Sequence, residues 1–155
     1  MTLTRTRSSR AIRVAFADDH LFVRAGLRRF IAGFPGFELV GEAASAEEAL
    51  ELVQGTDIDV LLLDVNMPGR SGLEILPQLL IAASRMKVVV VSAAPACLAA
   101  PAALRAGAWT YLEKPVNPNT LSECIRSAAA AASLAANDEG GGDRGEECLE
   151  KGTMT

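Results

Sequence analysis

The stretch Ile-Asp-Val-Leu-Leu-Leu-Asp-Val-Asn-Met-Pro-Gly-Arg-Ser-Gly, residues 58–72, indicates the fold of this chain. Residues 60–63 are apolar at every position, which is typical of a strand in a parallel sheet with helices on both faces. The predicted strand ends at Asp64, because the Pro-Gly pair at 68–69 favours a turn. Open α/β sheets bind ligands at the carboxyl ends of their strands, so Asp64 is a candidate functional residue. An aspartate at this place can also simply cap the following turn or helix.

Strand-like and helix-like segments alternate along the rest of the chain. We predict strands at residues 12–17, 37–42, 60–63, 87–91 and 109–112. Helical spacing and alanine-rich composition predict helices at residues 23–34, 45–54, 73–80, 96–106 and 118–136. Because crossovers between parallel strands are right-handed, this alternation predicts an α/β fold with a doubly wound, five-stranded parallel sheet.

Caps and prolines refine the predicted helices. Ser45, with Glu48 three residues later, has the pattern of a capping box at the start of the second helix. Pro77 is expected to kink or locally unravel the third helix, because it lacks an N–H and its ring clashes with the preceding turn. Pro101 is expected to shorten or bend the fourth helix for the same reason.

Length and composition predict a single folded domain. The chain has 155 residues, of which 50% are apolar, enough to bury one core. We predict a flexible arm at residues 1–11, the folded domain at 12–136, and a disordered tail or linker at 137–155. The net charge of −4 argues against direct binding of nucleic acid. Neither a membrane-spanning run nor a signal-peptide pattern is present, so we expect a cytoplasmic protein with no membrane partner.

Polar side chains follow four of the predicted strands. Asp18 and Asp19 follow the first, Asp64 follows the third, Ser92 the fourth, and Lys114 the fifth. The carboxyl ends of parallel strands share one edge of the sheet, so we expect these side chains to converge there. Clustered carboxylates repel one another unless a cation joins them, and a site of oxygen ligands suits Mg²⁺.

The same cluster suggests a reaction. A carboxylate can act as a nucleophile toward phosphorus and form an aspartyl phosphate. The Lys114 ammonium and the Ser92 hydroxyl would then contact the phosphoryl oxygens. Without the three acids, we would interpret Lys114 as a solvated loop lysine. The presence of these acids favours a functional role for it.

Four separate motifs carry a resemblance to a known family. They are Asp-Asp at 18–19, Asp-Val-Asn-Met-Pro-Gly at 64–69, Val-Val-Val-Val-Ser at 88–92 and Tyr-Leu-Glu-Lys-Pro at 111–115. In order and spacing they resemble the receiver domain of bacterial two-component response regulators, a flavodoxin-like (βα)5 fold, over roughly residues 12–135. Residues 18–27 resemble the subfamily whose receivers are usually followed by a LuxR-type helix-turn-helix domain.

The resemblance implies a metal site and a phosphorylation site. It makes Asp64 the phosphoacceptor and Asp19 a direct ligand of Mg²⁺. Asp18 would hold the ion mainly through water, and the backbone carbonyl of Asn66 would be a further ligand.

The resemblance also implies a switch. Ser92 would be the hydroxyl that moves toward the phosphoryl group, and Tyr111 the aromatic residue whose rotamer follows it. Lys114 would contact the phosphoryl group and precede a cis Pro115. The face used for partners would comprise the fourth helix, the fifth strand and the fifth helix, with Pro101 shaping it differently here.

These implications predict a phosphoprotein of phosphorelay signal transduction. A histidine kinase or phosphotransfer protein would donate the phosphoryl group, and phosphorylation would promote protein interaction or a homodimer. The chain would be a regulatory phosphoacceptor and not an enzyme. The alternative is a receiver or dimerisation fragment of a DNA-binding transcription regulator, whose helix-turn-helix domain is absent from this chain.

Other interpretations of particular residues were weighed. We expect His20 to be a polar helix cap and Trp109 to fill the core. No G-x-G-x-x-G follows the first strand, which argues against a dinucleotide. The Asp-Asp pair at 18–19 would repel a flavin phosphate. A haloacid-dehalogenase-type phosphatase would need an acid at the position of Asn66.

Overall fold

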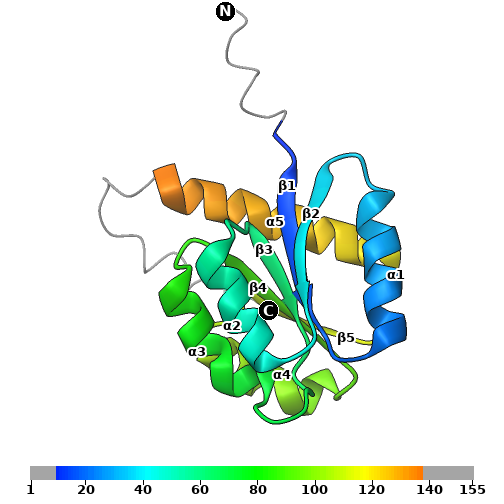
Figure 1. The fold of residues 1–155 in the computed structure, drawn as a ribbon, viewed down its shortest axis with the longest axis vertical. Helices are drawn as coiled ribbons and strands as arrows, with labels where there is room; N and C mark the ends of the chain where they lie inside the picture. Colours follow the sequence, from blue (N-terminus) through cyan, green and yellow to red (C-terminus); the bar gives the residue numbers. More distant parts are fainter. Residues whose placement is uncertain (1–9, 138–155) are drawn as a thin grey trace, which may run out of the picture.

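Strands and helices alternate strictly along the chain in the computed structural model, which describes residues 10–137 (Figure 1). The strands are β1 (Ile12–Ala17), β2 (Phe37–Ala43), β3 (Val60–Leu63), β4 (Lys87–Ser92) and β5 (Thr110–Glu113). The helices are α1 (Leu21–Ala32), α2 (Ala46–Gly55), α3 (Gly72–Ala82), α4 (Ala96–Ala106) and α5 (Pro118–Asn137). The predicted tail beyond residue 137 and most of the predicted arm lie outside the described residues.

All neighbouring strands are parallel, and their order in the sheet is β2-β1-β3-β4-β5. The predicted fold class is therefore confirmed. The order reverses direction between β1 and β3, and this is where open α/β sheets form a crevice at the carboxyl ends of their strands. Among the described helices, none is long and apolar enough to cross a membrane.

Side chains of β3 alternate between two separate cores. Leu61 and Leu63 pack with buried residues of α2, α3 and α4, whereas Val60 and Leu62 pack with buried residues of α1 and α5. Figure 1 shows these two groups of helices on opposite sides of the strands. All four β3 side chains are at most 2% exposed, which explains why the strand is apolar at every position.

The two prolines do not interrupt their helices, so the expected unravelling at Pro77 and shortening at Pro101 are wrong. Pro77 and Pro101 each lie at the sixth position of a helix that continues to its predicted end or beyond. A proline there removes one backbone hydrogen bond of the early helix, and the rest of the helix remains bonded. In α3, the fully buried Ile75, Leu76 and Leu79 anchor the helix on the sheet. Tertiary packing therefore outweighs the local penalty.

Helix caps agree with the sequence in most details. The Ser45 hydroxyl accepts a hydrogen bond from the Glu48 N–H at 3.2 Å, as predicted. The Glu48 carboxylate accepts from the N–H of Ala44, one residue before the expected partner. Gly107 ends α4 with a φ of 116°, a left-handed conformation that favours glycine.

Two smaller expectations need correction. Trp109 precedes β5 and is 36% exposed, so it does not fill the core as expected. The strand itself is shifted by one residue, to 110–113, because its residue-by-residue pairing with β4 runs from Thr110 to Glu113.

Candidate functional site

The sheet brings the predicted site residues to one edge. Ala17 of β1 pairs with Leu63 of β3, so the residues that follow them, Asp18 and Asp64, lie side by side. The Asp64 N–H donates to the Ala17 carbonyl at 2.9 Å, which extends this alignment past the strand ends. Strand β4 contributes its last residue, Ser92, and the Lys114 N–H donates to the Ser92 carbonyl at 2.8 Å.

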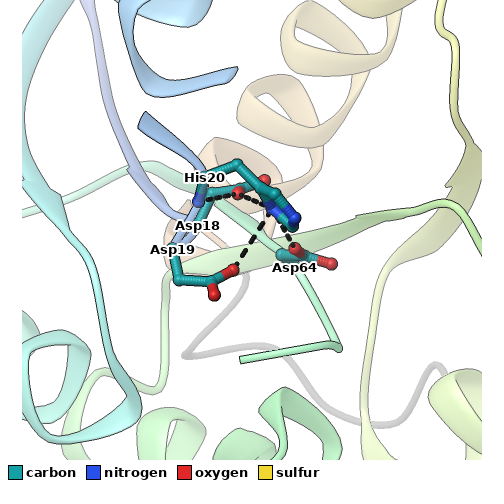
Figure 2. Close-up of side chains that lie close together, drawn as sticks. All are labelled: Asp18, Asp19, His20 and Asp64. Atoms are coloured by element: carbon teal, nitrogen blue, oxygen red, sulfur yellow. Dashed lines mark hydrogen bonds and ion pairs between the residues drawn. The ribbon is translucent and has the colours of Figure 1, made fainter. Parts of the chain in front are cut away.

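Three carboxylates and one imidazole form the centre of the site (Figure 2). Each of Asp18, Asp19, His20 and Asp64 offers one potential ligand atom, and these atoms all lie within 4.8 Å of one another. Asp18 and Asp64 are both 3% exposed, whereas the Asp19 side chain is 30% exposed. Two acids are thus buried at the base of the site, and one lies nearer the solvent.

Lys114, which follows β5, contacts both buried acids. Its Nζ lies 2.8 Å from Asp18 Oδ2 and 3.6 Å from Asp64 Oδ2. The Lys114 side chain is 21% exposed, so solvent screens these ion pairs less than those of a surface lysine. The lysine predicted to be functional therefore does contact the acid cluster.

The two buried carboxylates have opposite pKa shifts. Burial raises the pKa of Asp64 above its ordinary value, and the positive charge of Lys114 only partly opposes this. Burial also acts on Asp18, but the hydrogen bond from Lys114 and the contacts with His20 lower the pKa of Asp18 below its ordinary value. Lys114 therefore mainly stabilises the Asp18 charge, and the Asp64 charge is left incompletely compensated.

The site fits a hard divalent cation. Asp64 Oδ2 and Asp19 Oδ1 are buried and accept no hydrogen bond from the described residues. Buried carboxylate oxygens without donors are costly unless a cation neutralises them. Asn66 lies in the following loop, where its N–H donates to Asp64 Oδ1 at 3.2 Å. Mg²⁺ accepts carboxylate oxygens, backbone carbonyl oxygens and water molecules as ligands, and this site offers acids, a nearby backbone carbonyl and access to solvent.

The predicted switch residues are linked through the loop after β4. Ser92 is fully buried, and its hydroxyl accepts a hydrogen bond from the Ala94 N–H at 3.3 Å. The Tyr111 hydroxyl donates to the Ala94 carbonyl at 2.7 Å. Tyr111 is partly buried and packs against the core. The Lys114–Pro115 peptide bond is cis, as the resemblance implied.

Sequence reasoning missed the role of three residues at this edge. His20 precedes α1, but its side chain makes no capping hydrogen bond and lies instead against Asp18. The Arg24 guanidinium donates to the Asp18 carbonyl at 2.9 Å, one helical turn after His20. Gly72 donates to the Val65 carbonyl at 2.9 Å, directly beside Asp64. The position of His20 next to the Asp-Asp pair was the only available sequence signal.

Comparison with known proteins agrees with this geometry. A family model described as the response regulator receiver domain matches residues 14–126. The nitrate/nitrite response regulator protein NarL of Escherichia coli K12 is 37% identical over 117 residues, which cover 76% of this chain and 54% of NarL. NarP from the same organism is 38% identical over 116 residues, which cover 75% of this chain and 54% of NarP.

Solved structures give the same result. A two-component response regulator of the LuxR family from Aurantimonas sp. SI85-9A1 superposes with a TM-score of 0.72 at 31% identity. That match covers 78% of this chain and 86% of the other. The fold and the acids at the sheet edge define a doubly wound α/β domain with an acid cluster, and the chain belongs to the response regulator receiver domain family of two-component systems. It spans about half the length of the regulators NarL and NarP.

Proposed function

We propose that this chain is a phosphorylation-controlled switch that accepts a phosphoryl group on Asp64. The observation that supports this most directly is the position of Asp64 Oδ2. It is buried, accepts no hydrogen bond among the described residues, and lies 3.6 Å from the Lys114 ammonium. Such an oxygen is an available nucleophile next to a positive charge suited to a phosphoryl group.

In the proposed reaction, an Asp64 carboxylate oxygen forms a bond to phosphorus while the bond from phosphorus to the donor breaks. The donor, a histidine kinase or phosphotransfer protein, keeps the electron pair of that bond. When bound at Asp18, Asp19, Asp64 and the Asn66 carbonyl, Mg²⁺ would neutralise the carboxylates and polarise a phosphoryl oxygen. Lys114 would move from Asp18 toward the new charge, and the Ser92 hydroxyl would donate to a phosphoryl oxygen.

The proposal makes the chain a regulatory phosphoacceptor and not an enzyme that turns over a separate substrate. Hydrolysis of the aspartyl phosphate would be its only further reaction. Since a histidine kinase obtains its phosphoryl group from ATP, the proposal also places the chain in the cytoplasm. Phe22 and Leu21, which are 88% and 64% exposed beside the acid cluster, offer apolar surface to the donor protein.

Labelling with a small acyl phosphate tests the assignment. With Mg²⁺, the purified chain should gain one phosphoryl group, and peptide mass mapping should place it on Asp64. Asp64→Asn should prevent labelling, because an amide is a poor nucleophile. Asp57→Asn is the matched control, because this exposed aspartate lies at the opposite end of the sheet. Full labelling of Asp64→Asn would show that another residue is the phosphoacceptor.

A second candidate function follows from the length of the match. Because the chain spans 54% of NarL, it can be the receiver or dimerisation portion of a DNA-binding transcription regulator. Asp64 chemistry would be the same in both cases, and the output would differ. The extent of the natural reading frame distinguishes them, since a helix-turn-helix domain encoded after residue 155 would favour the second function.

A further inference from the structure

His20 lies at the start of α1 with its side chain 58% exposed, yet one of its ring nitrogens lies against the acid cluster. Its Nδ1 lies 3.0 Å from Asp18 Oδ1, 3.2 Å from Asp19 Oδ1 and 3.8 Å from Asp64 Oδ2 (Figure 2). The backbone N–H of His20 also donates to Asp18 Oδ1 at 2.9 Å, which fixes the start of the side chain beside the acids. One ring nitrogen therefore faces all three carboxylates.

The separations from His20 Nδ1 are close to those between two ligands of one metal ion, and all four candidate ligand atoms lie within 4.8 Å of one another. Two ligand atoms that lie about 2.1 Å from a tetrahedral ion are about 3.4 Å apart. The three distances from His20 Nδ1 lie on both sides of this value. Asp64, which is 3% exposed, directs an Oδ2 without a hydrogen-bond donor into the same space. The 4.8 Å limit on the four atoms is longer than this tetrahedral separation, so a cation would bind one nitrogen and three oxygens after the side chains close around it, without a change of fold.

We propose that His20 is a fourth protein ligand, which allows this site to bind Zn²⁺ or a similar transition-metal ion more tightly than Mg²⁺. Imidazole suits transition metals, whereas Mg²⁺ prefers oxygen and retains water. Four protein ligands complete a tetrahedral Zn²⁺ site and leave no position for a phosphoryl oxygen. The Zn²⁺ form is therefore an inhibited form of the domain. This inference shares Asp18, Asp19 and Asp64 with the proposed phosphorylation site and deepens that proposal.

Calorimetric titration of the tag-free, metal-free chain tests the role of the imidazole. His20→Gln should weaken Zn²⁺ binding at least about tenfold, because the amide that replaces the imidazole is a poor ligand for Zn²⁺. Mg²⁺ binding should stay the same or become tighter, because Mg²⁺ gains little from a nitrogen ligand. Gln54→Ala, at an exposed residue near the end of α2 and outside the cluster, is the control and should leave both affinities unchanged. Asp19→Ala should weaken the binding of both ions.

The single histidine of this chain provides a second readout. Nuclear magnetic resonance of its ring should show a Zn²⁺-bound Nδ1 at one equivalent of Zn²⁺, and a free imidazole at saturating Mg²⁺. Equal Zn²⁺ affinities of the wild type and His20→Gln, or a ring nitrogen that stays unligated, would show that His20 only hydrogen-bonds to Asp18. The two proposals can fail independently. If Asp64 is not labelled by an acyl phosphate but Zn²⁺ still binds through His20, the proposed function is contradicted and this inference is not.

Discussion

Asp64 is almost completely buried, which is unfavourable for its ionised form. Burial raises its pKa, and the nearby Asp18 charge acts in the same direction. Lys114 hydrogen-bonds to Asp18 and approaches Asp64 only to 3.6 Å, so it does not remove this penalty. In the absence of a bound cation, the ionised Asp64 is therefore a source of instability. Functional sites often contain such groups, because an unsatisfied charge is available for binding or reaction.

We expect Asp64→Asn to stabilise the metal-free protein at neutral pH, by on the order of 1 kcal/mol. With its pKa raised in the folded state, Asp64 retains its proton to a higher pH when folded than when unfolded. The ordinary pKa of an aspartate, 3.8, applies to the unfolded chain. The wild-type free energy of unfolding therefore falls as the pH rises from this value through the higher pKa of folded Asp64. The advantage of the variant should thus grow with pH across this window and vanish below it.

Urea unfolding in the presence of a chelator, at a series of pH values, measures this effect. Asp57→Asn is again the control, because it makes the same change at an exposed aspartate outside the acid cluster. An Asp64→Asn variant that is less stable than the wild type at neutral pH would mean that the Asp64 charge is adequately compensated without a metal.

At the scale of elements, helix α3 is attached directly to the loop that follows Asp64. A capping box of Ser71 and Glu74 begins the helix, with 3.0 Å and 3.2 Å hydrogen bonds to the N–H groups of Leu73 and Ser71. The first helical residue, Gly72, donates to the Val65 carbonyl. A Cβ at Gly72 would collide with the backbone carbonyl of Asp64. The glycine is needed for this close approach and not for an unusual backbone conformation.

Gly72→Ala should therefore affect both stability and phosphorylation. The new methyl group must move backbone atoms, which we expect to cost about 1–3 kcal/mol of stability and to slow labelling of Asp64. Gly26→Ala is the matched control, because Gly26 lies in α1 with open space at its Cβ position. That variant should be neutral or more stable by about 0.5–1 kcal/mol, since alanine favours the helix. Thermal unfolding and labelling rates of the two variants compare these effects, and equal behaviour would contradict the proposed contact.

At the scale of the whole molecule, the residues of the proposed switch connect the site to the surface of α4. Ala94 links Ser92, at the site, to Tyr111, which packs against the core. Leu98 and Leu104 of α4 are 76% and 49% exposed, so this region presents apolar surface to a partner. A ligand at Asp64 that moves Ser92 would disturb the Ala94 contacts and shift the balance between two arrangements of this surface.

A beryllofluoride mimic of the phosphoryl group should therefore change amide exchange in residues 96–125 and the association state seen by light scattering. Tyr111→Phe removes the 2.7 Å hydrogen bond to Ala94 and should reduce this response without preventing labelling of Asp64. Trp109→Phe is the control, because Trp109 is an exposed aromatic residue next to the same strand. If the mimic changes neither exchange nor association, the passive interaction module is favoured over the switch.

The sequence by itself determined the order and type of all ten elements. Apolar runs and helical spacing are local properties, so strands such as β3 and ends such as Gly107 follow directly from neighbouring residues. Parallel topology then placed Asp18, Asp64, Ser92 and Lys114 at one edge, because their strands all end there. These predictions needed only the pattern of the chain and the handedness of its crossovers.

Only the tertiary structure decided how the side chains at that edge are paired. Lys114 bonds to Asp18, 96 residues away, and His20 turns from its helix toward three acids. Position 72 must be a glycine because the backbone carbonyl of Asp64 lies too close to leave room for a Cβ. Helix α3 tolerates Pro77 because its apolar face is anchored in the core. Each of these outcomes depends on distances between segments that are brought together by packing. Local propensity contains no information about those distances, and for this reason the sequence indicated the site but not its internal contacts.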